Sequence, residues 1–126
     1  MPASISPVPH YGDLDKGIAY LKETFGFKEH IVHRDGAGNP MYAELELDGC
    51  YIGLGQTSPE ASPFDLGPAA FYVALDDPDA MHALATKAGA EIVMPLVDQE
   101  YGSREFAARD YVGNVWCFGT YRAGPN

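Results

Sequence analysis

The sequence is poor in basic residues and in cysteine. Its 8 lysines and arginines stand against 18 aspartates and glutamates, which gives a net charge of −10 over 126 residues. Such a surface repels the phosphates of nucleic acids and of anionic membranes, so neither is an expected partner. Two cysteines without CxxC spacing, Cys50 and Cys117, cannot build a disulfide framework. We expect both to be reduced thiols in a cytoplasmic protein.

Long apolar runs are also absent. No stretch approaches the roughly 18 apolar residues of a membrane-spanning helix, and the first residues lack the basic and apolar segments of a signal peptide. The composition is otherwise ordinary, with 46% hydrophobic and 12% aromatic residues. We therefore expect a single globular domain over residues 1–126 with its own core.

The chain carries an internal duplication. Residues 13–27 and 76–90 align at an offset of 63, which matches Asp13 with Asp76 and Gly26 with Gly89. Each copy is expected to hold a helix that begins after its aspartate and ends at its glycine. Spacing of apolar residues at i, i+3 and i+7 predicts the buried stripes. These stripes are Ile18, Leu21, Phe25 in the first helix and Met81, Leu84, Ala88 in the second.

Strand-like segments flank both helices. They cover 5–11, 27–32, 41–47 and 50–55 in the first copy, and 69–75, 91–94, 105–110 and 114–122 in the second. Asp35-Gly36 and Asp48-Gly49 indicate hairpin turns. Both copies therefore read β-α-β-β-β, an α+β class, with module one at about 4–56, a linker at 57–68 and module two at about 69–122.

This organisation resembles the vicinal oxygen chelate superfamily, the group of glyoxalase, bleomycin resistance protein and dioxygenase. Its most specific stretch, Tyr101 to Trp116, is similar to the Tyr-Gly, Arg-Glu-Phe, Arg-Asp and Gly-Asn signature of the bleomycin-resistance-like branch. Tyr111-Val112 departs from the Pro-Asp or Pro-Ala pair that is usual there. The resemblance implies tandem modules whose curved mixed sheets surround a cleft, with the helices outside, and a homodimer.

The resemblance also locates the metal-ligand positions of the enzymatic relatives. They fall here at Ser6, Gly53, Ala70 and Cys117. A metal site needs several imidazole, carboxylate or thiolate donors, and serine, glycine and alanine provide none. We therefore expect neither a metal nor another cofactor.

The turn at Asp48-Gly49 predicts which strand face meets a ligand. It would pair Tyr42 with Gly55, Glu44 with Gly53, and Glu46 with Tyr51. Because Gly53 falls on a cleft-facing position of the family, these residues should share that face. Two carboxylates flanked by tyrosines suit a cationic, aromatic ligand. The alternative is a solvated face of a half-exposed sheet.

Strand parity adds candidates to this face. His10 could bind ligand or act as a base, or be structural. Tyr72 could stack on a ligand or pack in the core, and Cys117 shares its parity but is expected to be a small buried hydrophobe. His30 and His33 differ in parity and should not form a metal pair.

The last hairpin leaves its side-chain directions open. A one-residue uncertainty in the loop between the last two strands would reverse every side chain. For Arg104, Glu105, Arg109 and Asp110 the expected role is therefore salt bridges that fix the hairpin, with no direction assigned.

These observations favour a metal-independent small-molecule binding protein that resembles the bleomycin resistance proteins and sequesters its ligand. One alternative is a glyoxalase-like lyase or isomerase that uses His10 with Glu44 or Glu46 as acid and base. Another is a dioxygenase-like enzyme with relocated metal ligands. The fold alone does not separate them.

Overall fold

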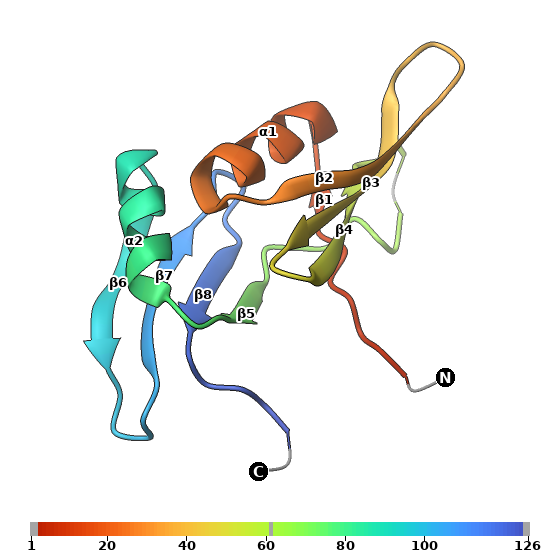
Figure 1. Cartoon of the computed structure of the whole chain (residues 1–126). Coiled ribbons are helices and arrows are strands. Elements are labelled where there is room, and N and C mark those ends of the chain that lie inside the picture. The colour runs from red at the N-terminus through yellow and green to blue at the C-terminus, as the bar shows by residue number, and fades with distance from the viewer. Residues whose placement is uncertain (1–2, 61, 125–126) are drawn as a thin grey trace. The chain divides into compact units, whose positions relative to one another are not determined.

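The structure is a computed structural model that describes residues 3–60 and 62–124. The chain divides into two compact units, 1–67 and 68–126, and each holds one helix and one four-stranded mixed sheet (Figure 1). The expected α+β class and the tandem β-α-β-β-β order are confirmed. Among the described residues, neither helix has the length and apolar character needed to cross a membrane.

The first unit contains β1 (His10–Tyr11), α1 (Leu14–Phe25), β2 (Lys28–Arg34), β3 (Pro40–Leu47) and β4 (Cys50–Gln56). Its sheet has the order β1-β4-β3-β2, with β1 parallel to β4 and the other pairs antiparallel. Helix α1 packs on one face of this sheet and buries Ile18, Leu21 and Phe25 as expected.

Strand β1 is much shorter than the segment 5–11 that the sequence predicts. Pro7 and Pro9 have no N–H to donate to a ladder, so only the last two residues pair as a strand. The carbonyls of both prolines still accept hydrogen bonds from Gly53 N and Gly55 N at 3.0 Å. The segment therefore runs along β4 at the edge of the sheet, where its prolines are tolerated.

Turn chemistry sets the register of the first sheet. Asp48 and Gly49 have φ angles of 50° and 83°, so both adopt the left-handed conformation of a two-residue turn. The predicted pairs Tyr42 with Gly55, Glu44 with Gly53, and Glu46 with Tyr51 are confirmed.

The second unit contains β5 (Ala70–Ala74), α2 (Pro78–Lys87), β6 (Glu91–Asp98), β7 (Arg104–Arg109) and β8 (Val115–Gly119). Its sheet order is β5-β8-β7-β6, and β5 is parallel to β8. Trp116 and Phe118 are fully buried with Phe106 in the core of this unit.

Two details of the second helix correct the sequence analysis. The N-cap is Asp77 and not Asp76, because the Asp77 carboxylate accepts the hydrogen bond from Ala80 N at 3.0 Å. The buried residues of α2 are Pro78, Met81 and Ala85, whereas Leu84 is 39% exposed. A constant offset of 63 fails here since α2 has 10 residues against 12 in α1.

Candidate functional site

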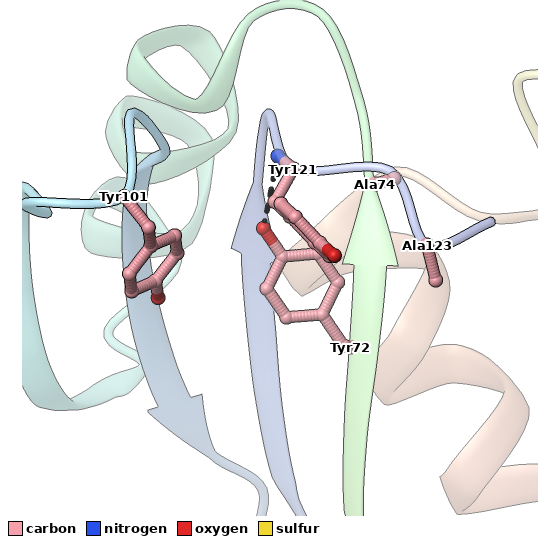
Figure 2. Close-up of a pocket in the computed structure, with 5 residues that line it drawn as sticks. All are labelled: Tyr72, Ala74, Tyr101, Tyr121 and Ala123. Atoms are coloured by element: carbon pink, nitrogen blue, oxygen red, sulfur yellow. Dashed lines mark hydrogen bonds between the residues drawn. The ribbon is translucent and has the colours of Figure 1, made fainter. Parts of the chain in front are cut away.

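The second unit contains an open pocket of about 610 Å³. Three elements contribute its tyrosines: β5, the turn between β6 and β7, and the segment that follows β8. The lining residues are Tyr72, Ala74, Tyr101, Tyr121 and Ala123, and we refer to them as the tyrosine pocket (Figure 2).

A glycine in β8 lets Tyr72 reach across the sheet. The parallel register places Tyr72 opposite Cys117 and Ala74 opposite Gly119. A Cβ atom at Gly119 would lie 2.3 Å from the Tyr72 hydroxyl, so a side chain there would displace the phenol. In its actual position the Tyr72 hydroxyl accepts a hydrogen bond from Tyr121 N at 3.1 Å, drawn as the dashed line in Figure 2.

The ring of Tyr121 stands nearly at right angles to those of Tyr72 and Tyr101. The ring centroids of Tyr72 and Tyr121 are 6.4 Å apart with an interplanar angle of 85°, and those of Tyr101 and Tyr121 are 6.0 Å apart at 88°. Each side chain is about half exposed, from 44% for Tyr72 to 61% for Tyr101. Ring faces therefore remain available to a ligand.

Beside these rings lies a buried carboxylate, Glu105, which is only 3% exposed. Strand β7 presents it directly opposite Gly119. Its Oε1 accepts hydrogen bonds from Gln99 Nε2 at 3.2 Å and from the Tyr101 hydroxyl. Its Oε2 accepts from Ser103 Oγ at 2.9 Å and from the Tyr72 hydroxyl at 3.1 Å. Two pocket tyrosines thus bind the same carboxylate.

These hydrogen bonds hold the carboxylate in its charged form. Burial alone would raise the pKa of Glu105, but the donors from Tyr101, Ser103, Tyr72 and Gln99 outweigh burial and lower that pKa. The hydrogen bond between Tyr101 and Glu105 raises the pKa of Tyr101 to about 12, because the carboxylate holds the phenol proton. Burial raises the pKa of Tyr72 as well. The pocket therefore combines neutral phenols with one negative charge.

Of the residues predicted to meet a ligand, only Tyr72 lines the tyrosine pocket. Cys117 is half buried in the adjacent strand, and burial followed by the Glu105 charge raises the pKa of its thiol to about 11. A neutral, inert thiol results at physiological pH.

Sequence reasoning missed Tyr101, Tyr121 and Glu105 as pocket residues. Tyr101 and Glu105 belong to the signature stretch, but the length of the β7–β8 turn was needed to fix the direction of Glu105. Tyr121 follows the last strand, where no periodicity indicates a side-chain direction.

The acidic strand face predicted from the first hairpin lies in the first unit. Tyr42 donates a hydrogen bond to Glu44 Oε2 at 3.2 Å, and burial together with this carboxylate raises the pKa of Tyr42. Glu46 Oε2 accepts from Gly49 N at 2.7 Å, so this carboxylate also braces the turn. Tyr51 is directly opposite Glu46 and about half exposed.

His10 is held by a residue of the expected linker. Its Nδ1 lies 2.7 Å from Asp65 Oδ1, and both side chains are 16% exposed. The ring lies over Gly55, where a Cβ atom would come within 2.4 Å of Nε2. This is the arrangement of an imidazole oriented by a carboxylate.

The parity argument that separated His30 from His33 is wrong. A register shift between Glu29 and Ile31 places an extra residue, His30, in the β2–β3 pair. His30 contacts Tyr51 edge-on at 5.0 Å, and His33 stacks with Tyr42 at 6.1 Å. Both imidazoles therefore contact tyrosines of the predicted face.

The signature charges of the last hairpin divide by role. Arg104 pairs with Asp79 and Asp98, and Arg109 pairs with Glu91. Asp110 is buried and accepts from Asn114 N at 2.9 Å and from Trp116 Nε1 at 3.0 Å. The ion pairs of Arg104 and Arg109 thus join β7 to β6 and to α2 and not to β8, so the salt bridges expected across the last hairpin are not where the sequence placed them. Asp110 holds the β7–β8 turn through neutral N–H donors, and Glu105 faces the pocket.

The four positions that the family resemblance assigns to metal ligands do not fit a metal here. Ser6 offers a hydroxyl, Gly53 has no side chain and Ala70 has a methyl group. The fourth position is Cys117, and the raised pKa of its thiol keeps it protonated. The position of Gly53 is also crowded, because a Cβ atom there would lie 2.7 Å from the Tyr42 hydroxyl. Among the described residues, no group of three or more His, Cys, Asp or Glu side chains is arranged to hold a metal ion.

Comparison with known proteins identifies the family. The model of the Glyoxalase/Bleomycin resistance protein/Dioxygenase superfamily matches residues 10–118. The chain belongs to this superfamily. An uncharacterized protein of Mycobacterium bovis is 30% identical over 90 residues, which are 65% of this chain and 59% of that protein. The chain thus spans about three fifths of the length of that relative.

Solved structures of the superfamily fold match nearly the whole chain. TioX from Micromonospora sp. ML1 is 26% identical with a TM-score of 0.81, and the match covers 96% of this chain and 100% of TioX. A glyoxalase-related enzyme from Clostridium phytofermentans is 20% identical with a TM-score of 0.71, and 94% and 95% of the two chains are covered. A virulence protein from Salmonella typhimurium is 22% identical, with a TM-score of 0.70 and coverages of 97% and 99%. The last two likenesses show the fold alone.

Proposed function

We propose that this chain binds a cationic, aromatic small molecule in the tyrosine pocket and releases it unchanged, in the manner of a bleomycin-resistance-like sequestration protein. The observation that carries the proposal is an ionised, buried Glu105 beside three half-exposed tyrosine faces. Aromatic faces and a nearby negative charge both attract cations.

The protonation states of the pocket support binding over catalysis. An efficient proton-transfer group has a pKa near the working pH. Here the pKa of Tyr101 is raised to about 12, that of Cys117 to about 11, and that of Glu105 is lowered. All three shifts take the pKa further from pH 7. Tyr101 and Cys117 therefore keep their protons, and Glu105 keeps its negative charge.

The branch assignment rests on the signature from Tyr101 to Trp116, which contributes both Tyr101 and Glu105 to the site. The superfamily model, whose name includes bleomycin resistance proteins, supports the grouping.

We also propose a role in binding for the acidic strand face of the first unit. Tyr42, Glu44, Glu46 and Tyr51 place two carboxylates among aromatic rings there. Such a face raises the local concentration of cations, and its effect should fall as salt screens it.

Calorimetric titration with planar aromatic cations and with anions of matched size tests the proposed function. We expect saturable binding of at least one cation with a stoichiometry of one, no binding of the anions, and recovery of the cation chemically unchanged by mass spectrometry. Failure of every cation to bind, or its conversion to a product, would contradict the proposal.

A second candidate function is suggested by the His10–Asp65 pair. A carboxylate 2.7 Å from Nδ1 orients the imidazole and leaves Nε2 free to exchange a proton with a substrate. This geometry suits a metal-independent lyase or isomerase with His10 as acid or base. Deuterium incorporation from D₂O into 2-oxo or 2-hydroxy carbonyl compounds, lost in His10→Gln, would support this candidate over sequestration.

We propose that the protein works as a homodimer in which the first module of each chain meets the second module of the other. Strand β1, which follows Pro7 and Pro9, lies at a sheet edge, where strands can cross to a partner. Light scattering should give twice 13.6 kDa at micromolar concentration. A mass of one chain at every concentration would contradict this.

A further inference from the structure

The hydrogen-bonding capacity of Glu105 is already used by the protein itself. An ionised carboxylate has about four acceptor sites, two on each oxygen. Gln99 and Tyr101 donate to Oε1, and Ser103 and Tyr72 donate to Oε2. Glu105 can therefore offer a ligand its negative charge but no further hydrogen bond.

The charge of Glu105 is not neutralised by these partners. All four donors are neutral groups, a side-chain amide and three hydroxyls. The arginines of the same strand are engaged elsewhere, Arg104 with Asp79 and Asp98, and Arg109 with Glu91. A buried anion without a neighbouring cation favours a positive charge in the adjacent pocket.

The ring geometry provides a place for that positive charge. Tyr121 stands nearly perpendicular to both Tyr72 and Tyr101, with centroid separations of 6.4 and 6.0 Å. At these separations a compact cation can lie within about 6 Å of two ring faces at once, the range of cation–π attraction. Ala74 and Ala123 add only methyl groups to the lining.

From these three features we infer that the tyrosine pocket selects a cation without N–H groups, an N-alkylated, quaternary ammonium. A primary ammonium or a guanidinium must give up hydrogen bonds to water, and the carboxylate that would replace them has no free acceptor site. A quaternary ammonium has no such hydrogen bonds to lose. The inference rests on the proposed function and names the group by which its ligand is held.

Three probes with one skeleton separate charge, shape and hydrogen bonding. Choline carries the quaternary ammonium, ethanolamine carries a primary ammonium, and 3,3-dimethylbutan-1-ol has the shape of choline without its charge. Titrations followed by amide chemical shifts should give a dissociation constant for choline at least about tenfold lower than for either of the other two.

Two pairs of matched variants locate the effect. Tyr121→Leu removes one aromatic ring from the pocket but keeps an apolar side chain. Its control is Tyr111→Leu, because Tyr111 is a tyrosine of similar exposure, 40%, in the β7–β8 turn. Glu105→Gln removes the buried charge, and Glu100→Gln removes an exposed one from the β6–β7 turn. We expect Tyr121→Leu and Glu105→Gln to weaken choline at least about tenfold, while both controls bind it as the wild type does.

The failure of this inference can be told from the failure of the proposed function. Binding of ethanolamine as tightly as choline, or the absence of choline binding, overturns the inference. If planar aromatic cations still bind in either case, the proposed function stands. If neither choline nor any planar cation binds, both are overturned. Since Glu105→Gln loses acceptor sites and could unsettle the pocket, Tyr121→Leu decides the outcome if Glu105→Gln does not fold.

Discussion

The two units share one backbone plan but place different chemistry on matching strand positions. A row across the first sheet runs His10, Gly55, Tyr42, and the corresponding row of the second sheet runs Ala74, Gly119, Glu105. The central glycine recurs in both rows, and in both a polar ring lies over it, that of His10 or of Tyr72. The duplication thus preserves the space above β4 and β8, while the charged groups around that space have diverged.

The same turn also occurs in both units with different consequences. Asp35 and Asp110 each begin an Asp-x-x-Gly-Asn turn in which the carboxylate accepts from the residues two and four positions later. The first turn joins β2 to β3 and is exposed throughout, whereas the second joins β7 to β8 and buries its first and last residues, Asp110 and Asn114. Only Asp110 additionally accepts from a tryptophan, Trp116.

The largest expected loss of stability comes from a substitution in the β7–β8 turn. Asp110→Ala removes the acceptor of several buried N–H groups, including Trp116 Nε1, and should lower the free energy of unfolding by about 3 kcal/mol. Asp35→Ala, in the exposed turn, should have a far smaller effect. Urea unfolding of both variants measures the difference. Equal effects would contradict the distinction between the two turns.

The glycine row offers the next comparison. In Gly119→Ala the new methyl group would meet the Tyr72 hydroxyl and would lie 2.7 Å from the Cβ atom of Glu105. That Cβ atom is attached directly to the backbone, so it cannot move aside as the end of a flexible side chain can. We expect a loss of about 1–3 kcal/mol in unfolding free energy and at least tenfold weaker binding of a planar cation. Gly55→Ala would meet only His10 among its nearest neighbours, so it should destabilise the protein without the same loss of binding in the tyrosine pocket.

The pH dependence of stability should depend on Glu105. Its pKa is lower in the folded protein than the ordinary 4.5, so its contribution is fully present above that value. The contribution is lost as pH falls below about 4.5 and through the lower folded pKa. Urea unfolding between pH 3 and 6 should therefore show a shallower fall in stability for Glu105→Gln than for the wild type. Parallel curves would show that the folded carboxylate is not stabilised in its charged form.

The smallest effects concern the two helix caps. Asp13→Ala and Asp77→Ala should each cost about 1 kcal/mol, because each carboxylate accepts from the backbone N–H three residues later. Asp76→Ala should cost much less, since Asp76 only pairs with Arg122 at the surface. Thermal unfolding of the three variants ranks them. A larger loss of stability in Asp76→Ala than in Asp77→Ala would show that Asp76, the residue predicted from the repeat, caps the helix.

Local signals predict most of the fold but only part of the site. The cap at Asp13, the stop at Gly26 and the turn at Asp48-Gly49 each depend on neighbouring residues alone, so the helix and the register of the first hairpin follow from the sequence. These elements are short-range, and the structure confirms them. Strand parity also makes Tyr72 a candidate, and Tyr72 lines the tyrosine pocket, but its role in binding stays a prediction.

The missed features depend on backbone irregularities that composition does not reveal. The bulge at His30 reverses parity within β2, and the five-residue turn from Asp110 to Asn114 decides that Glu105 shares a face with Gly119. Tyr121 lies beyond the last strand and is positioned by hydrogen bonds from its backbone to Tyr72 and Ser103. Each requires three-dimensional contacts to be known first.

We propose that the second unit carries the cation site, and a single titration can show whether it does. Uniformly ¹⁵N-labelled protein would be titrated with a planar quaternary cation while the amide shifts of both units are followed. We expect saturable shifts centred on Tyr72, Tyr101, Glu105 and Tyr121, with an affinity that Tyr121→Leu lowers at least about tenfold. Saturable shifts confined to Glu44, Glu46 and Tyr51 would contradict the account and assign the site to the acidic strand face.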